Sequence, residues 1–389
     1  MDYSTTIFGQ VSSFLSRYHF QAVVGQHAGD RYTKKYSAWN ELQVLLYAQA
    51  TGKDSLREIE TGLLTNEGAW HHLGIRSVKR STLADAHARR SYRIFESTFY
   101  DLLSHCTGIT PRHRFTFKNP LYALDSTMVE LCHSLFPWAK YRTTKGALKI
   151  HALFNVRTGI PEFLTVTDGK RGDITEARER LHALEAESIV VFDRGYVDYR
   201  WWYQLTQQKI WWVTRAKDNQ SVIVAGQHEK PVHPRCLADE KIYIGEFANQ
   251  HDYPDALRRV TWKDEASGET YRFITNNFKL SAEQVALIYK NRWQIELFFK
   301  WIKQNLKIKS FLGTSKNAVL SQIWVAMIYY LLLAYIKFQT RFKGSLLELT
   351  RMIRETLMMR RQIIDLLSLS TKTLKRLKPP DFPQMSLWV

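Results

Sequence analysis

The spacing of apolar residues changes once along the chain. In the first hundred residues apolar positions recur at helical spacing, which predicts helices over 37–50, 54–64 and 76–103. Thr82 and Asp85 are expected to cap the last of these. Short helices followed by a turn and a helix with a basic opening are typical of a helix-turn-helix-like DNA-binding module. Residues 1–110 are therefore predicted to be a helical domain. Because many helical pairs share that pattern, two interpretations are open: a DNA-binding module, or an ordinary group of packed helices.

From about residue 111 the apolar runs are short and separated by polar turns, which is typical of strands. The order is three strands, a helix and a further strand, at 121–132, 148–156, 161–169, 174–187 and 188–192. This is the opening order of an RNase H-like fold, so we expect an α/β catalytic core over 111–336. Strand-like runs from about 218 to 276 predict a β-rich insertion in it. Residues 337–389 are expected to form a basic, helical C-terminal region.

One apolar run, 318–336, is nearly long enough to span a bilayer. Ser321 and Gln322 interrupt it, and the predicted helix just before it is strongly charged. A buried core helix against which a sheet packs is the favoured interpretation. No membrane partner is expected.

The net charge of the chain indicates which class of molecule it binds. Lys and Arg number 55 and Asp and Glu 37, giving a formal net charge of +18 that is spread along the chain. A folded protein this basic is expected to bind nucleic acid, with an anionic membrane surface as the weaker alternative. Three cysteines without a paired spacing, and an N-terminus unlike a signal peptide, favour the cytoplasm, with association to the nucleoid through DNA.

A predicted helix over 289–308 holds a single acid, Glu296. At about 100° per residue, the residues that share its face are Tyr289, Arg292, Lys300, Lys303 and Lys307. Apolar residues fill the opposite side. Two interpretations are open: a solvated face on which Glu296 pairs with Arg292 and Lys300, or a carboxylate that binds a metal while its basic neighbours bind a polyanion.

Two aspartates help to decide between a solvated face and a metal-binding carboxylate. Asp125 lies within a strand on a face that is otherwise apolar, where a charge must be paired, neutralised or bound to a metal. Asp193 ends an apolar strand, where open α/β sheets bind ligands. Each alone could be a turn cap or an ion-pair partner. In an RNase H-like sheet, however, the first strand, the fourth strand and a late helix would bring both close to Glu296, and three oxygen ligands suit a pair of Mg²⁺ or Mn²⁺ ions roughly 4 Å apart.

The pattern Tyr289-x2-Arg292-x3-Glu296-x6-Lys303 resembles the Tyr-Arg-Glu-Lys signature of DDE transposases from bacterial insertion sequences, in insertion-sequence family four. Other short sequences agree with this resemblance. They are ALDST, VFDRGY and NRWQIE, which contain the three acids, FITNN before the helix of Glu296, and SLREI and STLADA near the N-terminus. The resemblance runs from about residue 35 to 335. The last 50 residues carry no matching motif.

The resemblance implies that Asp125, Asp193 and Glu296 are the catalytic, metal-binding triad and hold two Mg²⁺ ions, with Mn²⁺ as a substitute. It also implies that Tyr289, Arg292 and Lys303 contact DNA phosphates near the cleaved end. Lys300 and Arg194 are further candidate DNA contacts.

The function implied is cut-and-paste transposition: cleavage at the element ends, then transfer of the freed 3′-hydroxyl into target DNA. The expected partners are double-stranded DNA, at the inverted repeats of the element and at the target, and a second copy of the chain when assembled on DNA. The alternatives are a structure-specific nuclease with the same triad and a DNA-binding regulator with a spent active site.

Overall fold

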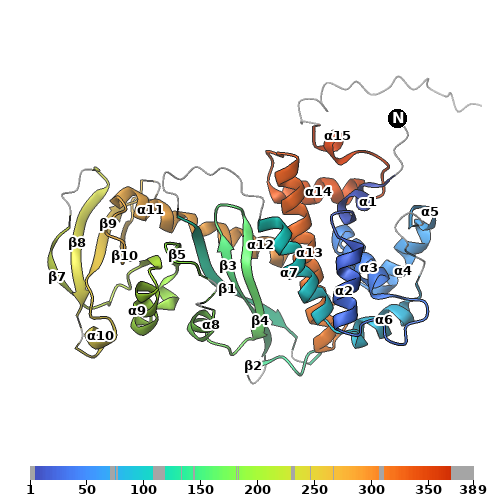
Figure 1. Ribbon diagram of the computed structural model, residues 1–389, viewed down its shortest axis with the longest axis horizontal. Coiled ribbons are helices and arrows are strands. Elements are labelled where there is room, and N and C mark those ends of the chain that lie inside the picture. Colours follow the sequence, from blue (N-terminus) through green and yellow to red (C-terminus); the bar gives the residue numbers. More distant parts are fainter. Residues whose placement is uncertain are drawn as a thin grey trace, which may run out of the picture.

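The computed structural model describes residues 5–70, 75, 78–107, 119–132, 134–142, 145–180, 182, 184–228, 233–245, 247–265, 267–305 and 311–368. A large sheet forms one side of the molecule and a group of helices the other (Figure 1). Leu306 and Lys307 of the predicted charged helix, and Arg76 of the predicted N-terminal module, lie outside the described residues.

The centre of the sheet has the predicted strands. β1 (Leu121–Leu131), β3 (Lys145–Asn155) and β4 (Ile160–Asp168) are antiparallel neighbours, with the short β2 (Lys140–Arg142) also paired to β3. On the other side of β1, β5 (Ile189–Phe192) runs parallel to it, and β6 (Trp211–Arg215) runs parallel to β5. Three antiparallel strands followed by two parallel ones fit the predicted RNase H-like core.

The strands expected between 218 and 276 continue this sheet. β10 (Thr270–Thr275) pairs antiparallel with β6. Beyond it come β9 (Leu257–Lys263), β8 (Cys236–Ile244) and, at the outer edge, β7 (Val222–Gln227). Because the chain returns to β6 through β10, the inserted strands are bonded directly to the central strands.

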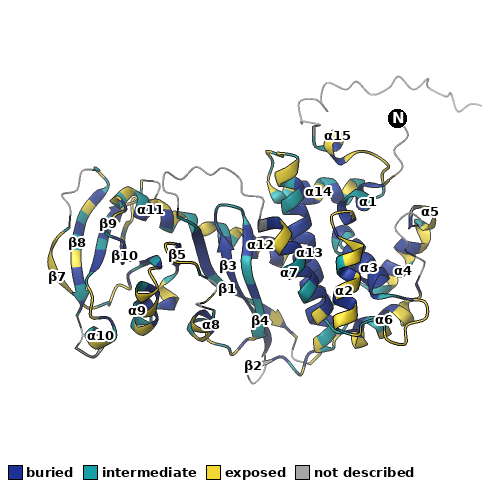
Figure 2. Cartoon of the chain, in the orientation of Figure 1, coloured by how far each residue is buried: buried dark blue, intermediate teal, exposed yellow. Residues whose placement is uncertain are grey.

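The helices at the other side surround α13 (Lys316–Gln339). They are α1 (Ile7–Ser12), α2 (Arg17–Gln26), α3 (Ala38–Thr51), α4 (Leu56–Thr65), α5 (Glu67–Trp70), α6 (Arg80–Arg89), α7 (Arg93–Thr107), α14 (Leu346–Thr356) and α15 (Ile363–Ser368). α13 is apolar and long enough to cross a membrane, but 89% of its most apolar stretch is buried inside the protein (Figure 2). It is the predicted core helix, and it shares one hydrophobic cluster with the N-terminal helices and one face of the sheet. A separate N-terminal DNA-binding domain stays a prediction.

The predicted helix over 76–103 is wrong in detail, because it is broken into α6 and α7. At Arg90 the backbone is extended (φ −69°, ψ 125°). The Arg90 side chain is buried and donates to Glu41, to the carbonyl of Tyr36 at 2.8 Å and to the carbonyl of Gly29 at 3.0 Å. These tertiary bonds hold the chain out of the helix. α6 begins at Arg80 without a side-chain cap, so the predicted capping by Thr82 and Asp85 is also wrong.

Two further helices differ from the prediction. α8 (Asp173–Glu179) is shorter than the predicted 174–187. α9 (Tyr199–Gln207) has no counterpart in the prediction, since its run of aromatic residues has no strong helix preference. Asp198 caps it by accepting from the Trp201 N–H at 2.8 Å. α8 and α9 cover the face of the sheet opposite to α13 and form a second hydrophobic cluster there.

Candidate active site

Strand pairing places the two predicted aspartates side by side. β1 and β5 are parallel, and Leu124 is the register partner of Phe192. Asp125 is the next residue of β1, and Asp193 directly follows the end of β5 with an extended backbone. Side chains alternate between the faces of a strand, and Leu121, Ala123, Ile189 and Val191 all belong to the cluster around α13. Asp125 and Asp193 continue this alternation, so both lie on the α13 face of the sheet.

Glu296 reaches the same place from a helix. α11 (Ala282–Asn291) packs on β6, β9 and β10, and α12 (Trp293–Asn305) packs on β1. The apolar side of α12 is buried as predicted, through Ile295, Phe298, Phe299, Trp301 and Ile302. Glu296 is half-buried on the other side, with 32% of its side chain exposed.

The single continuous helix predicted from Tyr289 is wrong at Arg292, where α11 ends and α12 has not yet begun. The Arg292 N–H donates to the Tyr289 carbonyl at 3.1 Å, and the Ile295 N–H donates to the Arg292 carbonyl at 3.1 Å. Both bonds span three residues and tighten the turn. The backbone at Arg292 stays right-handed helical (φ −53°, ψ −30°), so Arg292 and Glu296 remain on one face.

Three acidic side chains come together around Asp125. Burial raises the pKa of Asp125 to about 7 from an ordinary value near 3.8. The carboxylates of Asp193 and Glu296 add to this rise, whereas the Ser126 N–H and the Arg292 guanidinium oppose it. The carboxylates of Asp193 and Glu296 are therefore close enough to disfavour ionisation of Asp125. Three carboxylates this close together favour the binding of a cation.

Arg292 supplies a positive charge inside this group. Its Nη2 lies 2.5 Å from Glu296 Oε1 and its Nη1 lies 3.5 Å from Asp125 Oδ2. The ion pair between Glu296 and Arg292 that the simpler interpretation predicted is thus present, but within a cluster of three carboxylates. Among the ion pairs of the described residues, Glu296 has none with Lys300.

The chain matches the transposase DDE domain family over residues 116–332, which is more than half of its length. The chain belongs to the DDE transposase family. Residues 3–76 also match a family whose domain has no known function. The protein is therefore a DNA transposase, an enzyme that cleaves DNA and transfers strands, and neither the nuclease nor the regulator is favoured.

Curated relatives agree with this assignment. A relative from Sinorhizobium fredii, named as a transposase, is 35% identical over 285 residues, which are 72% of this chain and 78% of the relative. One from Geobacillus stearothermophilus, named for insertion sequence element IS5377, is 29% identical over 67% of this chain and 68% of its own length. One from Synechocystis sp., named for element IS4SA, is 25% identical over 66% of this chain and 71% of its own length.

Among solved structures, the piggyBac transposase synaptic complex with hairpin DNA aligns with a TM-score of 0.44 at 12% identity, covering 97% of this chain and 81% of that one. That likeness is too low to support a conclusion. The branch of insertion-sequence transposases to which the chain belongs stays a prediction from its signature residues.

The remaining predicted DNA contacts of the transposase lie around the three carboxylates at different depths. The Tyr289 ring is half-buried against Phe273, with centroids 4.9 Å apart, and the Arg292 guanidinium lies 5.7 Å from the Tyr289 centroid. Lys300 and Lys303 are exposed on α12. Arg194 is exposed beside Asp193 and lies 3.6 Å from Asp218.

Membership of the family implies that the transposase uses divalent metal ions, and the donor set fits them. All three acids offer carboxylate oxygens, the ligands that Mg²⁺ and Mn²⁺ prefer. One oxygen of Asp125 accepts from the Ser126 N–H at 2.8 Å, and one of Asp193 accepts from the Gly195 N–H at 2.8 Å. These bonds fix each aspartate, and the second oxygen of Asp125 faces the Arg292 guanidinium.

A large groove beside α12 is a feature that the sequence did not indicate. Its volume is 1270 Å³, and its walls come from α12, α13 and the segment that leads into α14. Its lining includes Lys300, Lys337, Arg341 and Lys343, and no acidic residue among those that the structure describes. The basic composition of 337–389 was the one available signal, but composition does not say on which side of the fold a segment will pack.

Proposed function

We propose that this transposase moves an insertion sequence by cut-and-paste, with Asp125, Asp193 and Glu296 as the ligands of two Mg²⁺ or Mn²⁺ ions. The observation that carries the proposal is the convergence of three carboxylates from β1, β5 and α12 on one face of the sheet, with a guanidinium between two of them. When bound, such ions activate the attacking oxygen and stabilise the leaving one.

The chain's own groups position these ligands. The parallel pairing of β1 and β5 fixes the two aspartates relative to each other, since each follows a bonded register pair. Glu296 is held by the packing of α12 on β1. Because one acid is on a strand, one directly follows a strand and one is on a helix with a buried face, the site has little freedom to change shape, as catalysis of phosphoryl transfer requires.

Arg292 has a second role once cations neutralise Asp125 and Glu296. Its guanidinium is then free to bind a phosphate oxygen, and planar guanidinium groups bind phosphates through two parallel hydrogen bonds. The Arg292 Nε is buried and has no hydrogen-bond partner among the described residues, so a donor is already unused. The Tyr289 ring packs beside the guanidinium and supports it.

Lys303 contacts the DNA farther along the strand. It is seven residues beyond Glu296, which is about 10 Å along the helix axis. That distance is too long for an ion pair with Glu296 and corresponds to one or two phosphates of a DNA strand. Arg194 would contact DNA on the Asp193 side, after giving up its exposed pair with Asp218.

The basic groove next to α12 is the proposed path for DNA that leaves the active site. Lys300 lies about 40° around α12 from Glu296, so it faces both the catalytic face and the groove. Phe298, Trp301 and Tyr330 pack against one another beneath the groove and are almost fully buried, so the basic side chains would make the contacts with DNA. This gives the C-terminal region a role that its sequence did not reveal.

The same site serves both reactions. Hydrolysis at the element end and attack of the freed 3′-hydroxyl on target DNA are in-line displacements at phosphorus that differ only in the nucleophile. The transposase would act on the inverted repeats and the target as a dimer assembled on DNA, in the cytoplasm at the nucleoid.

The deciding experiment is a gel assay with labelled element ends, target DNA and Mg²⁺. Joined products are expected. Cuts without joining would favour the nuclease, and a mobility shift without cutting would favour the regulator.

A further inference from the structure

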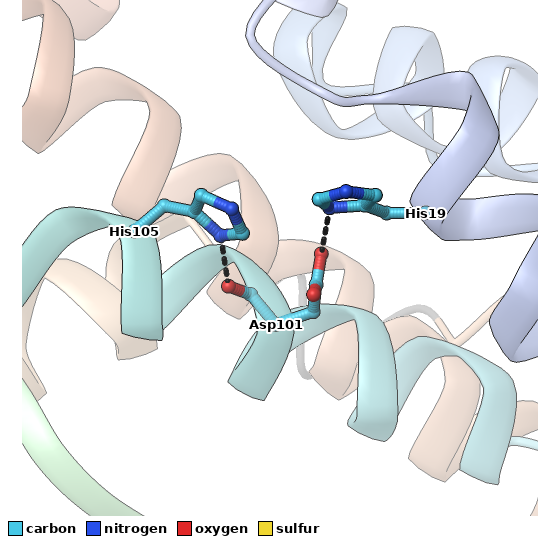
Figure 3. Close-up of side chains that lie close together, drawn as sticks. All are labelled: His19, Asp101 and His105. Carbon is cyan, nitrogen blue, oxygen red and sulfur yellow. Dashed lines mark hydrogen bonds and ion pairs between the residues drawn. The ribbon is translucent and has the colours of Figure 1, made fainter.

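A second group of metal-ligating side chains lies on helices that carry none of the three carboxylates. His19 is on α2, and Asp101 and His105 are on α7 (Figure 3). Their donor atoms all lie within 4.8 Å of one another. Within the described residues, this is the one group of three His, Cys, Asp or Glu residues that meets this distance; the carboxylates of Asp125, Asp193 and Glu296 are more widely spread.

The packing of α2 on α7 brings these three side chains together. Asp101 and His105 are four residues apart on α7 and share a face of that helix. His19 comes from α2, which packs on α7, and its Nδ1 lies 3.6 Å from Asp101 Oδ2. The two imidazole rings have centroids 5.3 Å apart, and Figure 3 shows both on the side of Asp101 that faces α2.

The orientation of His105 is that of a metal-binding histidine. Its Nδ1 lies 2.7 Å from the carbonyl oxygen of Asp101. An N–H at Nδ1 donates to this carbonyl and leaves the lone pair of Nε2 available. Histidine ligands usually donate their second ring N–H in this way, which fixes the tautomer and the ring direction.

The surroundings of the group favour a cation. The ion-pair partner of Asp101 among the described residues is His19, which is charged only when protonated, so no permanent cation neutralises this carboxylate within that part of the chain. The three side chains line a cavity of 270 Å³ whose other walls are largely apolar, including Phe14, Leu15, Val23 and Tyr335. Within the described parts of the chain, no Lys or Arg lines it. His19 and Asp101 are 43% and 38% exposed, so an ion can enter.

We propose that His19, Asp101 and His105 bind a zinc ion that links α2 to α7. Two imidazole nitrogens and one carboxylate oxygen suit Zn²⁺, with water as the fourth ligand, whereas Mg²⁺ prefers oxygen ligands alone. The site is separate from the carboxylates of the DDE domain. His19 lies in the segment 3–76, and Asp101 and His105 lie between that segment and the DDE domain, so the ion joins the N-terminal segment to the helix that follows it.

The test uses the full chain, freed of metal with a chelator and then titrated with Zn²⁺ alone in the presence of millimolar Mg²⁺. We expect one Zn²⁺ per chain by calorimetry and a higher unfolding temperature in zinc. Titration with Co²⁺ should give visible absorption bands of a nitrogen- and oxygen-ligated ion. His19→Ala, Asp101→Asn and His105→Gln should each weaken zinc binding by about tenfold or more.

His27→Ala is the matched control. His27 also joins α2 to α7, through a 3.0 Å hydrogen bond to Ser97, but it is not in the group. This variant should lose stability without losing zinc, and Asp125→Asn should also bind zinc like the parent. Absence of zinc binding, equal loss of binding in His27→Ala, or unchanged binding in folded His19→Ala and His105→Gln, with folding checked by circular dichroism, would overturn the proposal.

Discussion

Arg292 and Glu296 are joined across one helical turn, with Nη2 2.5 Å from Oε1, and the same guanidinium reaches Asp125 at 3.5 Å. Arg292 therefore stands where positive charge is needed between two acids of the candidate site. In the proposed mechanism Asp125 and Glu296 would hold the metal ions, and Arg292 would then be free to bind a DNA phosphate. The three acids, the metal ions, the basic face of α12 and the groove can each be tested separately.

The first prediction concerns the three acids. Asp125→Asn, Asp193→Asn and Glu296→Gln should each reduce cleavage of element ends below detection while leaving specific end binding largely intact. Each change removes a metal ligand and keeps the size of the side chain. Cleavage and mobility-shift assays on the same preparations test this, and retained cleavage in any variant would remove that residue from the site.

The second concerns the metal. Cleavage should require Mg²⁺ or Mn²⁺, and Ca²⁺ should support DNA binding with little turnover, since it is larger and less strict in its geometry. The measurement is a cleavage time course in each ion and in EDTA. Full activity in EDTA would end the two-ion proposal.

The third concerns the basic face of α12. Arg292→Ala and Lys303→Ala should keep the fold and weaken end complexes, each lowering the slope of log affinity against log salt by roughly one phosphate contact. Lys290→Ala is the control, because Lys290 is exposed on the same pair of helices but points away from this face. A parent-like salt titration of Lys303→Ala would mean that the face is merely solvated.

The fourth concerns the groove. Reversing charge in Lys300→Glu or Lys343→Glu should weaken DNA binding by about tenfold at low salt, because each places a carboxylate against the phosphate backbone. Lys263→Glu, on the exposed end of β9, should have a much smaller effect. Equal losses at Lys263 and Lys343 would show that only net charge matters and that the groove is not the DNA path.

The fifth concerns pH in the absence of metal. Burial raises the pKa of Asp125 to about 7, so between about pH 4 and 7 the folded protein keeps a proton that the unfolded chain has lost. The free energy of unfolding should therefore fall as pH rises through this range, with a contribution from Asp125 of at most about 1.4 kcal/mol per pH unit. Asp125→Asn should remove this part of the pH dependence. Urea denaturation in EDTA at several pH values measures it, and identical slopes in both proteins would contradict it.

The sequence could predict that Asp125, Asp193 and Glu296 lie close together because the determinants of this proximity are local, while their catalytic role stays a prediction. Asp125 and Asp193 each follow an apolar strand stretch, and the parallel pairing of those strands is built into the predicted strand order. The face of α12 follows from helical spacing alone. The break at Arg90 was not visible, because it depends on Glu41 and two carbonyls that are distant in sequence.

The same limit applies to the surfaces that the sequence missed. Asp101 and His105 have a recognisable four-residue spacing, but their third partner, His19, is on another helix, and no spacing rule connects it to them. Lys337, Arg341 and Lys343 form a groove wall with Lys300 only because α13 and the segment after it pack beside α12. These arrangements depend on tertiary packing.

The position of α13 also has a consequence for the order in which the protein is made. α3, α6 and α7 complete their hydrophobic core against α13, which ends at Gln339, so they must wait until that helix has left the ribosome. A nascent chain interrupted before Lys316 would expose those apolar faces to chaperones and proteases. The N-terminal helices therefore become a stable surface only after α13 has been synthesised.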